Sequence, residues 1–88
     1  MVLDIHNFGE SLLSRPAGKE AFALAKAYII NLLDEKETIS LDFKNVKVLT
    51  PAWADEFVTS LKKQYKNPIK FLNTENESVS LSLKYVTA

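Results

Sequence analysis

The stretch from Ser40 to Tyr65 most constrains the fold of this 88-residue chain, because its pattern predicts a buried strand followed by an amphipathic helix. Apolar and polar residues alternate over 38–43, as in a strand. Thr50 and Pro51 then form a helix-start signal, since threonine can cap a backbone N–H and proline lacks one. The apolar arc of the predicted helix comprises Trp53, Ala54, Phe57, Val58, Leu61 and Tyr65.

The flanking segments predict five further elements. Apolar residues over 2–5 and 11–13 indicate two short strands, which the intervening turn residues would pair as a hairpin. Pro16 opens a helix that extends to about Asp34, with Leu24, Tyr28 and Leu32 on its apolar arc. Residues 69–72 indicate a further strand. The tail over 75–86 fits both an alternating strand and a helix with a Thr74–Glu77 capping box, and we favour the helix.

The resulting order, β-β-α-β-α-β-α, predicts an α/β fold with a small mixed sheet that includes the N-terminal hairpin. The length is that of one domain over residues 1–88. The residues predicted to form its core are Phe22, Ile29, Leu41, Phe43, Phe57, Val58, Leu61, Ile69 and Phe71.

Composition excludes several classes of function. The chain has no cysteine, so it forms neither disulfides nor thiolate metal sites. Its 11 basic and 11 acidic residues balance, so there is no basic excess to attract nucleic acid. The longest apolar run, 21–33, is interrupted by Lys26 and Asn31 and is too short to span a bilayer. His6 is the only histidine and has no second ligand at metal spacing. We therefore expect a cytoplasmic protein without cofactor, metal, membrane or nucleic-acid partner.

Residues 41–57, LDFKNVKVLTPAWADEF, resemble the core motif of the STAS superfamily, which comprises sulphate-transporter and anti-sigma-factor-antagonist domains. Ser14, Arg15 and Ala17, together with 54–56 and 73–86, resemble more closely a bacterial STAS-like domain family of unassigned function. In the antagonists a phosphorylated serine occupies the position that alignment assigns to Ala52. The resemblance therefore implies that the usual phosphate acceptor is missing here, and leaves Thr50 and Thr59 as outward hydroxyls.

The resemblance implies a small non-enzymatic regulatory module that binds another protein in a partner-switching or signalling pathway. The implied partner is a histidine-kinase-like ATPase or an anti-sigma-type regulator. The expected contact residues, at the start of the second helix, are Thr50, Trp53, Asp55, Glu56 and Thr59. Four of them also have simpler interpretations. Thr50 can be a helix cap without a binding role, Trp53 can pack in the core, and Asp55 and Glu56 can be solvated charges on a helix.

Three alternatives remain open from the residues. The module could sense a small anion or nucleotide at the sheet edge, where Arg15 and Lys19 stand near a helix start. It could be an enzyme using Asp42 and Asp55, although the sequence contains no evident nucleophile or perturbing partner. Asp42 could instead bond the turn that follows it. Finally, Ala23, Ala27 and Ile30 on the outer face of the first helix predict weak homodimerisation or docking of a partner there.

Overall fold

The computed structural model describes residues 1–87, except for the side chain of Ile30. The prediction that Ile30 belongs to a dimer face therefore falls outside the described residues. Strands β1 (Val2–Asp4), β3 (Ile39–Asp42) and β5 (Ile69–Leu72) form a parallel sheet in the order β1-β3-β5. A second parallel pair joins β2 (Ser11–Leu12) to β4 (Val48–Leu49). The α/β class predicted from the sequence is confirmed, and its strands and helices alternate largely as expected.

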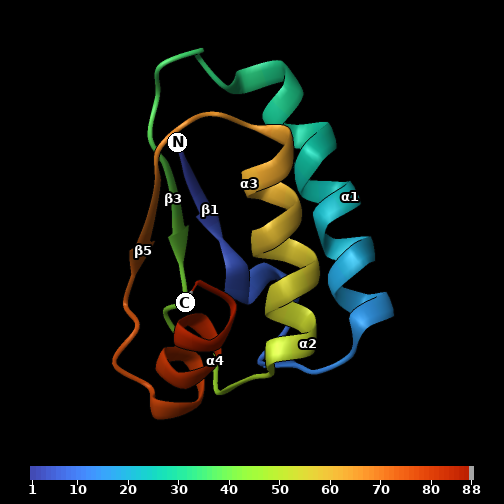
Figure 1. The fold of residues 1–88 in the computed structure, drawn as a ribbon, viewed down its shortest axis with the longest axis vertical. Helices are drawn as coiled ribbons and strands as arrows, with labels where there is room; N and C mark the ends of the chain where they lie inside the picture. The colour runs from blue at the N-terminus through green and yellow to red at the C-terminus, as the bar shows by residue number, and fades with distance from the viewer. Residues whose placement is uncertain (88) are drawn as a thin grey trace.

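The helices cover one face of the three-stranded sheet (Figure 1). Helix α1 (Arg15–Leu32) lies alongside a continuous helix composed of α2 (Pro51–Ala54), the π-helical turn η2 (Asp55–Thr59) and α3 (Ser60–Gln64). Helix α4 (Glu77–Thr87) packs against α2 and β4. Among residues 1–87 there is no helix with both the length and the apolar content needed to cross a membrane.

The predicted N-terminal hairpin, and with it the mixed sheet, is wrong. β1 pairs with β3 and β2 pairs with β4, so every strand pairing among residues 1–87 is parallel. The reason is the 3₁₀ turn η1 (Ile5–Phe8), which is capped at its start because the Asp4 carboxylate accepts from His6 N at 3.1 Å. The turn ends at Gly9, whose φ of 126° is a backbone conformation that residues with a side chain rarely adopt. The turn redirects the chain into the second sheet and does not fold it back on the first.

The helical interpretation of the tail is confirmed, but its cap is not the predicted threonine. The side chain of Asn76 accepts from Val79 N at 3.2 Å at the start of α4. Ser78 Oγ accepts from Leu49 N at 2.9 Å and Ser82 Oγ donates to Leu49 O at 2.5 Å. The two serines therefore satisfy backbone groups of β4 that would otherwise be free to pair with a further strand. Helix α4 thus covers this edge of the β2–β4 pair.

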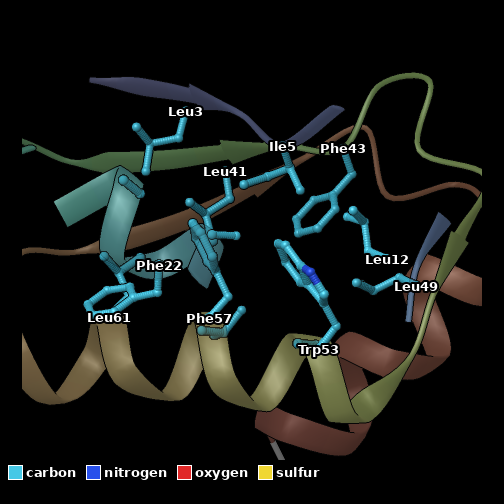
Figure 2. Close-up of a cluster of buried hydrophobic side chains, with 14 of the residues drawn as sticks. Leu3, Ile5, Leu12, Phe22, Leu41, Phe43, Leu49, Trp53, Phe57 and Leu61 are labelled. Atoms are coloured by element: carbon cyan, nitrogen blue, oxygen red, sulfur yellow. The ribbon is translucent and has the colours of Figure 1, made fainter. Parts of the chain in front are cut away.

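The core lies between the sheet and the helices, where side chains from β1 and β3 meet Trp53 and Phe57 (Figure 2). Seven of the nine predicted core residues are buried, whereas Ile69 and Phe71 on the outer strand β5 are only half-buried. Trp53 and Phe57 stack with ring centroids 5.1 Å apart. The predicted core residues with almost no exposed surface lie on three elements: Ile29 on α1, Leu41 on β3, and Phe57, Val58 and Leu61 on the α2–α3 helix.

The predicted apolar arc of α1 is too wide. Leu24, Tyr28 and Leu32 are 62%, 53% and 58% exposed. The buried residues of α1 form a narrower line, which comprises Gly18, Ala21, Phe22, Ala25 and Ile29. The cause is that α1 packs on α2 and η2, and no described strand lies beyond β1 to cover the flank that carries Leu24.

Candidate functional site

Thr50 joins three parts of the fold at the start of α2. Its side-chain oxygen accepts from Trp53 N at 3.3 Å, so the predicted N-cap is confirmed. The same hydroxyl donates to Leu13 O at 2.5 Å, and Thr50 N donates to Leu12 O at 3.0 Å. These bonds fasten the end of β2 to the helix start. The Thr50 hydroxyl is therefore already engaged both as donor and as acceptor.

Trp53, one of the five predicted contact residues, faces the interior. Its side chain is 1% exposed and packs against Phe57 and Phe8. In this structure its ring therefore belongs to the core and is not available to a partner protein. The other four predicted contact residues are half-buried and line the start of the α2–α3 helix.

A charged cluster links the start of α1 to the π-helical turn. Arg15 Nη1 lies 2.8 Å from Asp55 Oδ2 and 3.4 Å from Glu56 Oε1. Thr59 Oγ1 donates to Asp55 Oδ1 at 2.7 Å. The exposed fractions of the Arg15, Asp55 and Glu56 side chains are 55%, 42% and 29%. The cluster is thus an ordered surface feature that solvent and a partner can both reach.

Hydrogen bonding favours the ionised state of this cluster. The hydrogen bond from Arg15, with a second from Thr59, lowers the pKa of Asp55 below its usual range. The bond to Asp55 in turn raises the pKa of Arg15. One cation therefore faces two carboxylates, and the cluster carries a net negative charge at neutral pH.

Close packing of two helices brings Arg15 to Asp55. A Cβ atom on Gly18 would lie 2.7 Å from Trp53 O and 3.1 Å from Trp53 Cα, which is closer than ordinary contacts. Glycine at this position therefore allows α1 to approach the backbone of α2. The sequence predicts neither this crossing nor the Arg15–Asp55 pair, although a lone glycine inside an apolar helical pattern is a signal of close packing.

The structure does not assemble the predicted anion site. Arg15 is engaged by two carboxylates, and the side chain of Ser14 accepts from Ala17 N at 3.2 Å in the first turn of α1. Lys19 is exposed and forms no ion pair with any residue in 1–87. The two cations therefore do not converge with free backbone donors on one ligand.

Asp42, a candidate catalytic carboxylate from the sequence, bonds to the turns around it. It accepts from Asn73 Nδ2 at 2.7 Å and from Lys44 N at 3.0 Å, and the Asn73 bond lowers its pKa. Its side chain therefore has the turn-bonding role that was the simpler alternative. Within residues 1–87 there is no group of three or more His, Asp or Glu side chains arranged to hold a metal ion.

Comparison with known proteins identifies the family of this chain. A family model described as a STAS-like domain of unknown function (DUF4325) matches residues 26–79. The chain belongs to this family. No curated protein and no solved structure matched it in the corresponding comparisons. The matched range of this STAS-like domain includes Asp55 and Glu56, while Arg15 lies before it in the chain.

The sequence resemblance to anti-sigma-factor antagonists predicts that Ala52 stands where those proteins carry the phosphorylated serine. Ala52 lies half-buried in the first turn of α2. The two hydroxyls considered as replacements both have partners, since Thr50 bonds Leu13 O and Thr59 bonds Asp55. A phosphate on either residue would have to break a bond that holds the site together.

Proposed function

We propose that this STAS-like domain is a non-enzymatic regulatory module that binds another protein through the surface around Arg15, Asp55 and Glu56. The observation that carries the proposal is the convergence of these solvent-accessible charges from the start of α1 and from the π-helical turn η2. The side chains are held before any partner arrives, which reduces the entropy lost on binding. Two of the three segments on which the resemblance to the STAS-like family rests thus meet at one place on the surface.

Exposed apolar residues near the charges support the same surface. Leu13 is 51% exposed, and its carbonyl oxygen accepts from Thr50 at the start of α2. Pro51 is also exposed. Protein interfaces typically combine apolar contacts with a polar rim. Because the charged cluster carries one net negative charge, we expect the facing surface of the partner to carry a cation.

The partner class that we propose is a histidine-kinase-like ATPase or an anti-sigma-type regulator, in keeping with the STAS-like family. Since Ala52 replaces the phosphorylated serine, release of the partner would not use that modification. Binding would then be regulated on the side of the partner or by its concentration.

The test is capture of partners with the tagged domain, followed by affinity measurements on the purified pair by calorimetry. Glu56→Lys reverses the sign of the net charge of the cluster and repels the cation expected on the partner, so we expect it to weaken binding by roughly tenfold or more. The matched control is Glu35→Lys, which makes the same change at an exposed position beyond the far end of α1. Equal affinities for the two variants would show that this surface is not the contact.

A further inference from the structure

A groove runs between α1 and the N-terminal segment, apart from the charged cluster. Two cavities of about 320 Å³ each form it, and the linings of both include Asn7, Phe8 and Leu24. Val2 on β1 and Tyr28 on α1 both line one of the cavities. The residues of the charged cluster line neither of them. The groove is therefore a second surface, and a ligand bound there would be independent of the protein contact proposed at the charged cluster.

One wall of the groove is a free sheet edge. β1 lies at one edge of the β1-β3-β5 sheet. The carbonyl oxygen of Met1, the residue before β1, accepts from Ser40 N of β3 at 2.8 Å. In a parallel pair, residues that face the partner strand alternate with residues that face away. Asp4 is the N-cap of the 3₁₀ turn η1, so its C=O belongs to that turn. The backbone N–H and C=O groups of Val2 and the N–H of Asp4 therefore face outward. No strand within residues 1–87 pairs with them.

The other wall is the apolar line on α1 that consists of Leu24, Tyr28 and Leu32, each more than half exposed. These residues follow one another at intervals of four, so they share one flank of the helix. A strand added beside β1 would extend the sheet over this flank. One extended ligand would thus satisfy the free backbone groups of β1 and cover the apolar line of α1 at the same time.

The charges of the groove indicate the chemistry of that ligand. Asp4 and Glu20 are the charged residues in the two linings, and neither lining contains a lysine or an arginine. A second copy of this chain seated at the same edge would bring its own Asp4 and Glu20 to these carboxylates, which is unfavourable. A segment with lysine or arginine would be attracted instead.

We propose that the β1 edge and the apolar line of α1 bind an extended segment of a partner protein in which apolar residues alternate with basic ones. The segment adds a fourth strand beside β1. Its apolar side chains pack on Leu24 and Tyr28, on the face of the sheet that Leu3 also uses. Its basic side chains point to the opposite face, where Asp4 lies exposed.

The first experiment titrates the isotope-labelled domain with two synthetic seven-residue peptides of alternating Lys and Val or alternating Glu and Val. We expect the basic peptide to shift the backbone resonances of Val2, Asp4 and Leu24. We expect it to bind several-fold more tightly than the acidic one, because its lysines are attracted by Asp4 whereas glutamates in the same places are repelled. Equal binding of the two peptides, absence of binding, or shifts confined to the β5 edge would overturn the proposal.

A variant of one groove residue tests the apolar wall. Leu24→Lys removes an exposed apolar side chain and repels a basic peptide, whereas Leu81→Lys makes the same change on α4, where the leucine is 57% exposed. We expect the first to abolish binding, the second to leave it unchanged, and both variants to melt as the parent does. Sedimentation of the domain without peptide tests the other occupant. Dimerisation that Leu24→Lys removes would assign the groove to a second copy and overturn the proposal.

Discussion

Replacement of Gly18 by alanine tests the packing that assembles the charged cluster. In a helix interior exposed to solvent, alanine is more favourable than glycine by about 1 kcal/mol. At Gly18 the new Cβ would lie 2.7 Å from Trp53 O and 3.1 Å from Glu56 Cβ. Trp53 O is a backbone atom of α2, so one helix has to move as a whole.

Forced overpacking of this kind costs about 1–3 kcal/mol, and so severe a contact belongs near the upper end. After subtraction of the gain in helix propensity, we expect Gly18→Ala to lower the free energy of unfolding by about 2 kcal/mol. For a domain of this size that corresponds to a drop in melting temperature of roughly 8–16 °C. The assay is urea unfolding followed by the fluorescence of Trp53, which is buried against Phe57.

The control is Ala23→Gly, at an exposed position of the same helix, which measures the propensity term alone. We also expect Gly18→Ala to separate Arg15 from Asp55, and so to raise the pKa of Asp55 toward its usual value in a carboxylate NMR titration. Suppose instead that Gly18→Ala stabilises the domain by as much as Ala23→Gly destabilises it. The two helices would then not be in close contact at Gly18, and the explanation given for the cluster would be refuted.

Three further predictions concern the core, the tail helix and the cluster. Phe57→Ala should lower the free energy of unfolding in urea by about 3–5 kcal/mol, because it opens a cavity at a fully buried ring, and a loss below about 1 kcal/mol would contradict that placement. Ser82→Ala should lower it by about 1 kcal/mol by removing the bond to Leu49 O, and an unchanged melt would show that α4 does not depend on this bond. Because the bond from Arg15 lowers the pKa of Asp55, the parent should be more stable to unfolding than Arg15→Gln at pH values above about 4, the ordinary pKa of aspartate. This difference in stability should disappear as the pH falls through the lowered pKa of Asp55 in the folded state. Urea melts of both proteins across that range measure it, and a difference independent of pH would contradict the ion pair.

The patterns that the sequence determined correctly are local ones. The cap at Thr50, the helix that follows it, the strand over 39–42 and the helical tail were all predicted and are all present. Each depends on groups within a few residues of one another, as in the bond between Thr50 and Trp53 N. The resemblance to the STAS-like family rests on the same short segments and is confirmed by the family match over residues 26–79.

Decisions that depend on distant partners were made only by the tertiary structure. The turn residues after β1 fit both a hairpin and a 3₁₀ turn, and pairing with β3 selected the second. Leu24 and Ile29 have the same apolar character, yet only Ile29 is buried, because a helix covers its flank and no described strand covers the other. Arg15 meets Asp55 across 40 residues of sequence through the contact at Gly18. Periodicity shows that a helix has an apolar face, but the number and order of the neighbouring elements decide how much of that face becomes core and how much stays exposed.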